Sequence, residues 1–145
     1  MKFTPITIKS ALITCTSILF ISSLFFPALL FQYQKSLPGF QILAWGWWGI
    51  LTLDFAWFAN PIYLIGLMYL KKEEYVAARY CSAGALVLGA SSFSAKEWWF
   101  NEGSGTPIMG LGSAFYIWML SFLLLFIGSF FVSAPNKALE RDSAP

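Results

Sequence analysis

Charged side chains are scarce in this sequence. Of its 145 residues, 11% are Asp, Glu, Lys or Arg, whereas an average soluble domain has about 25%. The charges are also clustered, because none occurs between Lys9 and Lys35 or between Glu102 and Lys137. Such a chain cannot cover a water-facing surface with charge, so the sequence indicates a protein whose surface faces lipid.

Histidine is absent, and the two cysteines, Cys15 and Cys81, form no Cys-x-x-Cys motif. Zinc, haem and iron–sulfur centres need such ligands, so we expect no metal or other cofactor. We interpret both cysteines as small apolar packing residues. An enzyme ranks lowest, because no nucleophile–base pair or paired carboxylates are found. Basic and aromatic residues are not interleaved, so no nucleic-acid partner is expected.

Long apolar runs occupy most of the chain and match the roughly 20 residues of a membrane-spanning helix. In hydrocarbon the backbone must pair within helices or a closed barrel, and these runs lack the two-residue alternation of barrel strands. We therefore predict an all-α fold, in which a single domain (residues 1–145) forms a bundle of four transmembrane helices. The expected spans are residues 10–31, 51–70, 76–93 and 108–132.

Basic residues are unevenly distributed around these spans. The N-terminal segment, the second loop and the C-terminal tail carry Lys2, Lys9, Lys71, Lys72, Arg79, Lys137 and Arg141, whereas the first and third loops carry Lys35 and Lys96. Cytoplasmic segments of membrane proteins are enriched in Lys and Arg. This pattern predicts a multi-pass protein with both termini in the cytoplasm.

The segment before the second span leaves two alternatives open. A continuous helix over residues 40–70 has a length of about 46 Å, which exceeds a hydrocarbon core of about 30 Å. Either that helix is tilted or extends outward, or residues 40–50 form an interfacial segment. Trp45, Trp47 and Trp48 favour the interfacial alternative, because tryptophan concentrates at the level of the lipid headgroups.

The third span differs from the others in its many small residues. Ala78–Ser82 and Ala85–Gly89 are pairs of small residues separated by three positions. Such pairs allow helix backbones to approach closely in lipid. We predict that Ala78, Ser82, Ala85 and Gly89 form a packing face at the centre of the bundle, with part of the small-residue surface available to a partner chain.

Asp54 is the one charged residue between Lys35 and Lys71. Three interpretations compete. It caps the N-terminus of the second span, or it binds a polar group such as Tyr116, Asn101 or Lys96 on another segment. In the third it belongs to a site that handles a ligand or a proton, since an acid within a membrane is often functional.

The surroundings of Asp54 keep the third interpretation open. Pro61 has no N–H, so the carbonyl of Trp57 lacks its helical partner. The tryptophans near this level are explained by an aromatic belt, or they line an outward crevice for an amphipathic or cationic ligand. The ligand-binding candidates are Asp54, Trp57, Asn60, Tyr116 and Trp118.

Two stretches, "GWWGILTLDFAWFANPIYLIGLMYL" and "AFYIWMLSF", carry a resemblance. With the W-x-ANP element formed by Trp57, Ala59, Asn60 and Pro61, they resemble a set of small four-helix bacterial inner-membrane proteins that have no assigned activity. The resemblance covers about 40 residues. It implies a bacterial inner (plasma) membrane location and gives no residue a role.

Two classes of function follow from these observations. The first is a binding or interaction module of the inner membrane, such as an accessory subunit, an immunity-type protector or a regulator. Its partners are the lipid bilayer and either another membrane protein or a second copy of the chain. The alternative is a small oligomeric transporter or proton-coupled carrier that uses Asp54.

Overall fold

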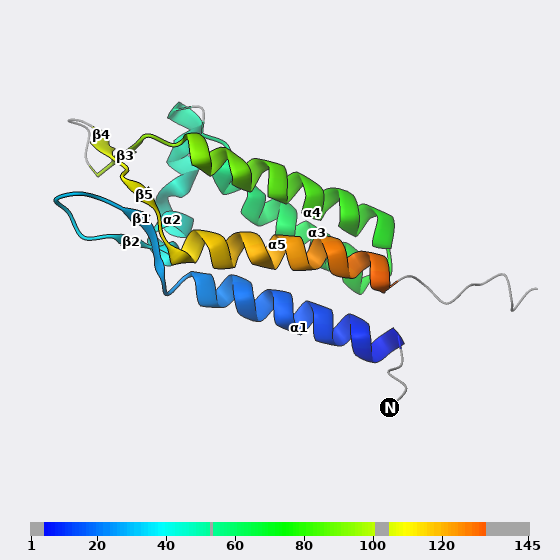
Figure 1. The fold of residues 1–145 in the computed structure, drawn as a ribbon. Coiled ribbons are helices and arrows are strands. Elements are labelled where there is room, and N and C mark those ends of the chain that lie inside the picture. The colour runs from blue at the N-terminus through cyan, green and yellow to red at the C-terminus, as the bar shows by residue number, and fades with distance from the viewer. Residues whose placement is uncertain (1–4, 53, 101–104, 133–145) are drawn as a thin grey trace, which may run out of the picture.

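The computed structural model describes residues 5–52, 54–100 and 105–132, and this part of the chain is mostly helical (Figure 1). Its α-helices are α1 (Pro5–Ser23), α2 (Gly39–Trp45), α3 (Ala59–Lys71), α4 (Tyr75–Ala90) and α5 (Ser113–Phe131). Three short 3-10 helices are η1 (Gly46–Thr52), η2 (Ala56–Phe58) and η3 (Ser91–Ser94). The strands are β1 (Pro27–Leu30), β2 (Leu37–Pro38), β3 (Glu97–Trp99), β4 (Gly105–Pro107) and β5 (Gly110–Leu111).

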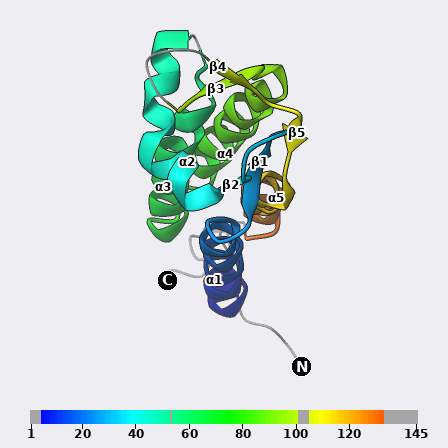
Figure 2. The same cartoon turned by 90° about the vertical axis from the view of Figure 1, so that its left-hand side faces the viewer.

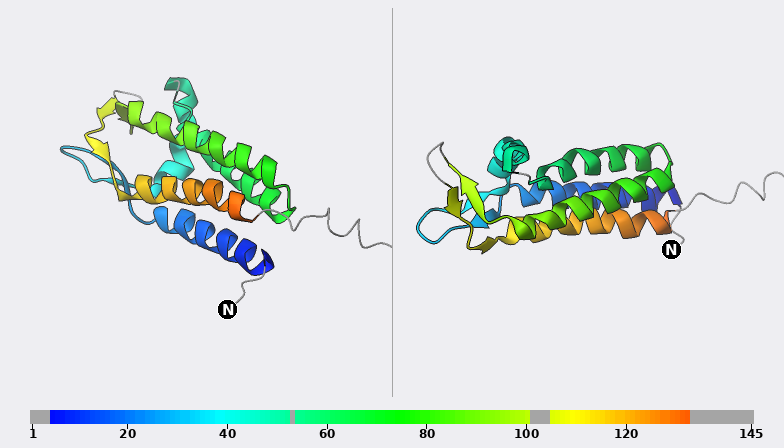
Figure 3. Two further views of the ribbon diagram at one scale, coloured as in Figure 1. Left: turned by 45° about the vertical axis from the view of Figure 1, so that its right-hand side comes forward. Right: turned by 90° about the horizontal axis from the view of Figure 1, so that it is seen from above.

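The four longer helices lie side by side and form a bundle (Figures 1 and 3). Helix α1 packs on α5, α5 on α4, and α4 on α3. Helices α1 and α3 meet where the rings of Phe20 and Tyr63 stack, with 5.0 Å between their centroids. The core of the bundle contains Leu12, Phe20, Ala59, Tyr63, Leu70, Ala78, Ala85, Phe122, Leu125 and Val132.

Small hydroxyl residues are also buried in this apolar core. Thr16, Ser23, Ser121 and Ser129 each donate a hydrogen bond to the carbonyl three positions earlier in their own helix. A hydroxyl that is paired within its own helix needs no partner across the interface. Because these side chains are also small, they allow the helices to approach each other.

The α3–α4 turn marks one end of the bundle, here called the turn end. Glu73 in this turn has a positive φ of 67°, and Lys9 of α1 donates a 2.7 Å hydrogen bond to its carboxylate. This hydrogen bond raises the pKa of Lys9 above its ordinary value. Arg79 donates to the carbonyl of Ser129 near the end of α5, where helix carbonyls lack partners within the helix.

The opposite end, here called the strand end, is built from two connections that are far apart in the sequence. Strands β2, β1 and β5 form an antiparallel sheet in that order, with Leu29 opposite Leu111. Strands β3 and β4 form a separate antiparallel pair. The rings of Phe31 and Phe100 also meet edge to face, with 5.3 Å between their centroids. The two connections therefore form one structural unit.

The α2–η1 segment (residues 39–52), here called the crosswise segment, runs across the direction of the bundle helices (Figures 2 and 3). It lies at the level where α4 and α5 meet the strands, and the strands lie farther out (Figure 1). The expected interfacial segment, residues 40–50, falls within it. The alternative of one continuous helix from residue 40 to 70 is wrong, because η1 and the turn around Asp54 separate α2 from α3.

The predicted boundaries differ from the observed helices in three of the four spans. Residues 10–31 are helical only as far as Ser23, and residues 51–70 enter an α-helix only at Ala59. Residues 108–132 begin as loop and strand, and α5 starts at Ser113. In each case apolar residues belong to strands or turns, because apolarity alone does not distinguish a helix from a short buried strand. The fourth, residues 76–93, matches α4 and η3.

Helix α5 is the one helix within the described residues that is long and apolar enough to cross a membrane. The apolar part of α1, Ile8–Ser23, is shorter. Helices α3 and α4 have 13 and 16 residues. The mostly helical character of the chain is therefore established, and the four-span arrangement stays a prediction.

Candidate functional site

Asp54 lies in the turn between the crosswise segment and η2. Its Oδ1 accepts a hydrogen bond of 3.0 Å from the backbone N–H of Ala56, the first residue of η2. Its own N–H donates to the carbonyl of Gly49 at 2.8 Å. A Cβ added to Gly49 would lie only 2.9 Å from the Asp54 carbonyl oxygen, so glycine permits this close approach.

This arrangement agrees with the capping interpretation only in part, because the N-cap position of η2 is occupied by Phe55 and Asp54 lies one residue earlier. The carboxylate pairs with an N–H at the start of η2, which continues directly into α3. Helix starts leave such N–H groups without partners, and a short acidic side chain satisfies them. Of the other partners considered above, Asn101 lies outside the described residues, and no hydrogen bond joins Asp54 to Tyr116 or Lys96 in the part that the structure describes.

Trp57, Asn60 and Trp118 are joined in one chain of hydrogen bonds. The indole N–H of Trp57 donates to the carbonyl of Leu43 in α2 at 2.8 Å. The side-chain amide of Asn60 donates to the carbonyl of Trp57 at 2.8 Å. The indole N–H of Trp118 in α5 donates to the Asn60 Oδ1 at 2.9 Å. This series of hydrogen bonds thus connects α2, η2, α3 and α5.

The chemistry of the partners fixes the orientation of the Asn60 amide. An indole N–H can only donate and a backbone carbonyl can only accept, so the oxygen must face Trp118 and the nitrogen must face Trp57. Pro61, the third residue of α3, cannot donate to the Trp57 carbonyl four positions back. The Asn60 side chain supplies the missing donor. Within the W-x-ANP element, Asn60 therefore supplies the hydrogen-bond donor that Pro61 cannot provide at the start of α3.

The four predicted packing residues all lie inside the bundle. Ala78, Ser82, Ala85 and Gly89 are the buried residues of α4, which packs on both α3 and α5. The Ser82 hydroxyl donates to the Ala78 carbonyl at 2.8 Å. A Cβ on Gly89 would lie 2.6 Å from the Met119 sulfur and 3.2 Å from the Trp118 ring. This face is therefore occupied within the chain itself and not open to a partner.

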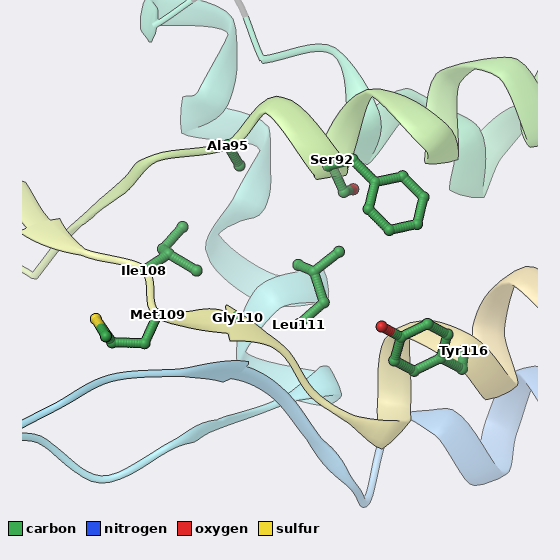
Figure 4. A pocket seen from close by; sticks show the side chains of 8 residues that line it. Ser92, Ala95, Ile108, Met109, Gly110, Leu111 and Tyr116 are labelled. Atoms are coloured by element: carbon green, nitrogen blue, oxygen red, sulfur yellow. The ribbon is translucent and has the colours of Figure 1, made fainter.

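Tyr116 is separate from the hydrogen-bonded chain. It lines an open cavity of about 270 Å³ at the strand end, and its side chain points toward Leu111 (Figure 4). The other lining residues are Ser92, Phe93, Ala95, Ile108, Met109, Gly110 and Leu111. All of them are uncharged, and the volume is just below the roughly 300–1,000 Å³ of typical ligand pockets. The lining therefore offers no charged side chain to a ligand.

The five ligand-binding candidates therefore do not converge on one pocket. Three of them form a structural network, Asp54 makes a local turn contact, and Tyr116 lies at the cavity. Sequence reasoning missed the Leu43 carbonyl, which the indole of Trp57 reaches across 14 positions. It also missed the role of Gly46, where an added Cβ would lie 2.9 Å from the Trp57 ring. The available signal was the pair of glycines, Gly46 and Gly49, on either side of Trp47 and Trp48.

Comparisons with other proteins add no assignment. A scan against protein-family models and searches of curated proteins and of solved structures found no match to this chain. Within residues 5–52, 54–100 and 105–132, no three His, Cys, Asp or Glu side chains lie close enough together to hold a metal ion.

Proposed function

We propose that the chain is a four-span protein of the bacterial inner membrane, with both termini in the cytoplasm, and that it acts as a binding or interaction module through its strand end. The exposed aromatic and Met side chains at that end are the observation that carries this proposal. Tyr33, Trp99 and Met109 are 90%, 51% and 63% exposed. Tyr33 lies in the connection between α1 and α2, and Trp99 and Met109 lie in the connection between α4 and α5. The β1–β5 pairing joins these two connections.

The sides of the bundle support the membrane part of the proposal. Each of the four longer helices exposes large apolar side chains, among them Ile18, Ile21, Leu64, Ile65, Val76, Val87, Leu123 and Ile127. Such a surface is unfavourable in water, where each buried apolar side chain gains about 1.5–3 kcal/mol, and it is favourable in lipid. The 19 residues of α1 and of α5 extend about 28 Å, close to a hydrocarbon core of about 30 Å.

The charges support the proposed orientation. Lys9, Lys71 and Lys72 gather at the turn end, where Lys9 pairs with Glu73. Excess Lys and Arg mark the cytoplasmic side, so the strand end is the extracytoplasmic one. There the strands project beyond the helices (Figure 1). In water, large exposed apolar side chains gathered in one region indicate a surface for a protein partner.

The geometry favours an interaction module over a carrier. A carrier that uses Asp54 needs the carboxylate beside a cavity, whereas this carboxylate accepts a hydrogen bond from the backbone of its own turn. Asp54, Trp57, Asn60 and Trp118 line neither the cavity beside Tyr116 nor a smaller one of about 130 Å³ formed by Ile65, Met68, Tyr69 and Lys72. The small-residue face of α4 is buried within the bundle, so the partner contact falls to the strand end.

Cysteine labelling tests the orientation. In a Cys15→Ser, Cys81→Ser background, we expect Gln34→Cys at the strand end to react with a membrane-impermeant maleimide on intact cells. Lys72→Cys at the turn end should react only after the cells are permeabilised. Reaction of both positions in intact cells, or of Lys72→Cys alone, contradicts the orientation.

Site-specific photo-crosslinking tests the interaction surface. A photoreactive amino acid replaces Tyr33 or Trp99 in cells, with Lys72 and the exposed α4 residue Val87 as matched control positions. We expect one discrete adduct from both strand-end positions and none from Lys72. An adduct from Val87 but not from Tyr33 or Trp99 would place the contact on the side of the bundle and overturn the proposed surface.

A further inference from the structure

The crosswise segment (residues 39–52) exposes several large apolar side chains that the rest of the described structure does not cover. Its exposed residues include Phe40, Trp45, Trp47, Trp48, Ile50 and Leu51. None of the residues of α2 is buried. The sequence has no charged residue between Lys35 and Asp54, so the segment carries no charge for a charged partner to recognise.

Backbone hydrogen bonds at both ends of this segment, and contacts with Trp57, join it to the rest of the protein. The N–H groups of Gly39 and Phe40 donate to the carbonyls of Phe26 and Leu24, and the Gly49 carbonyl accepts from the N–H of Asp54. The Leu43 carbonyl accepts from the Trp57 indole, and Gly46 lies against the ring of Trp57. Because Trp57 immediately precedes α3, these contacts fix the level of the segment relative to that helix. The three tryptophans of the segment stay 46–61% exposed, and the rings of Trp47 and Trp48 contact each other with 4.9 Å between their centroids.

The length of α3 determines that level. Its 13 residues extend about 20 Å, and the three residues of η2 add about 6 Å at the rise of a 3-10 helix. Measured from the charged turn end, the crosswise segment therefore begins about 26 Å along the bundle. A hydrocarbon core is about 30 Å thick. The segment thus lies near the outer edge of the core and not beyond it.

The orientation of the segment fits the same level. It runs across the bundle helices (Figures 2 and 3), and is therefore parallel to the plane of a membrane that these helices cross. Tryptophan is enriched where hydrocarbon meets headgroups. Helices that lie in this plane bury an apolar face about 5–10 Å into the boundary between headgroups and acyl chains.

We propose that the crosswise segment docks on the outer leaflet of the lipid bilayer and that this contact completes the membrane anchoring of α3, the shortest helix of the bundle. The proposal rests on the proposed function, since it assumes that the bundle crosses the membrane. The occupant of the aromatic surface is lipid, not a second protein. The protein partner proposed above therefore contacts the strands beyond this level.

Spin-label depth measurements on the full chain in lipid nanodiscs test the proposal. Single cysteines are introduced in a Cys15→Ser, Cys81→Ser background and labelled with a nitroxide. The test positions are Leu51, which is 72% exposed, and Trp45, which is 61% exposed. Gln34 serves as the water reference, and Leu123, near the middle of α5, serves as the deep reference. Collision with oxygen reports lipid contact, and collision with a water-soluble nickel chelate reports contact with water.

We expect labels at Leu51 and Trp45 to collide with oxygen freely and with the nickel chelate several-fold less often than the label at Gln34. Their depth should be about 5–10 Å below the phosphates, and shallower than that of Leu123. Nickel collision equal to that at Gln34 means that the segment is in water. Protection from both reagents means that protein covers it. Either result overturns the lipid contact.

The Leu123 label separates this inference from the proposed function. If Leu123 is deep and Leu51 is in water, the bundle crosses the membrane and only the lipid contact fails. If Leu123 itself is accessible to the nickel chelate, the membrane-spanning bundle fails first.

A Trp57→Phe variant removes the indole hydrogen bond to Leu43 and provides a second readout. If lipid holds the segment, the Leu51 label keeps its depth in this variant. A shift of the label into water shows that the Trp57 contact, and not lipid, positions the segment, which also overturns the proposal.

Discussion

The small-residue face of α4 and the Trp57–Asn60–Trp118 hydrogen-bonded chain hold the same bundle by opposite means. Along α4, Ala78, Ser82, Ala85 and Gly89 contribute little side-chain volume, and stability comes from close backbone approach. At the start of α3, large aromatic residues are held by directed hydrogen bonds. The first device tolerates no added volume, and the second tolerates no lost donor or acceptor.

The two devices meet at Trp118. Its ring packs against Gly89 of α4, and its indole N–H bonds Asn60 of α3. A tryptophan can serve both because it has a broad apolar face and one polar edge. The small residue at position 89 therefore makes room for the ring whose edge closes the hydrogen-bonded chain, so the two regions are coupled through one side chain.

The largest expected effect is that of added volume on the α4 face. Gly89→Leu forces Met119 and Trp118 to move, because even a Cβ lies within 2.6 Å of the Met119 sulfur. We expect a loss of about 3 kcal/mol in the free energy of unfolding, measured by titration of the detergent-solubilised protein with SDS. Gly84→Ala is the matched control on the same helix. Its added Cβ has Ile62 at 3.8 Å as its nearest neighbour, and because Ala is a better helix former than Gly, this variant should not lower stability.

Removal of the amide at Asn60 should have the next largest effect. Asn60→Ala removes the side-chain donor to the Trp57 carbonyl and the acceptor for the Trp118 indole, so we expect a loss of about 2 kcal/mol in the same titration. Asn60→Asp keeps an acceptor for Trp118 but loses the donor to Trp57. It should therefore remain clearly destabilising. Wild-type stability in Asn60→Asp contradicts a role for the amide as a donor.

A double-mutant cycle sharpens the comparison between packing and hydrogen bonding. Trp118→Phe keeps most of the ring against Gly89 and removes the indole N–H. When Trp118→Phe is combined with Asn60→Ala, we expect a coupling energy between the two changes of about 1 kcal/mol. This is the usual scale for hydrogen bonds between helices in membranes. A coupling near zero shows that Trp118 stabilises the bundle through packing alone.

Asp54 should show a smaller effect that depends on the substituent. Asn caps a helix start about as well as Asp, whereas Ala does not. We therefore expect Asp54→Asn to change the free energy of unfolding by only a few tenths of a kcal/mol and Asp54→Ala to lower it by about 1 kcal/mol. An equal loss of unfolding free energy in both variants contradicts a capping role and indicates that the charge of the carboxylate matters.

Tyr116 should show the smallest effect. Its side chain is exposed and lies beside an open cavity, so Tyr116→Phe is expected to change the free energy of unfolding by less than about 0.5 kcal/mol. A larger loss in the SDS titration means that the hydroxyl has a structural partner at the strand end.

The parts of this structure that the sequence predicts are those encoded by local spacing. Ala78, Ser82, Ala85 and Gly89 are separated by three or four positions, so they fall on one face of any α-helix. The missing partner of the Trp57 carbonyl follows directly from Pro61. Both features depend on residues within one or two turns, where the geometry of the helix is known before any fold is known.

The candidate site was predictable only in part, because its contacts join distant residues. The Asn60–Trp118 hydrogen bond spans 58 positions, and no local pattern indicates which indole reaches the amide. Strands β1 and β5 consist of apolar residues that lie within the predicted spans 10–31 and 108–132, and they become strands because each provides hydrogen-bond partners for the other. The two strands pair because β1 follows α1, β5 precedes α5, and these two helices pack against each other.

By itself the sequence determined that the chain is mostly helical and apolar, and which face of α4 is buried, since composition and helical period act locally. Tertiary structure alone decided that Asp54, Trp57, Asn60, Tyr116 and Trp118 belong to three separate environments and not to one crevice. It also decided that residues 39–52 run across the bundle. These outcomes depend on where α3 begins relative to α2 and α5, and that position is set by contacts between residues far apart in the chain.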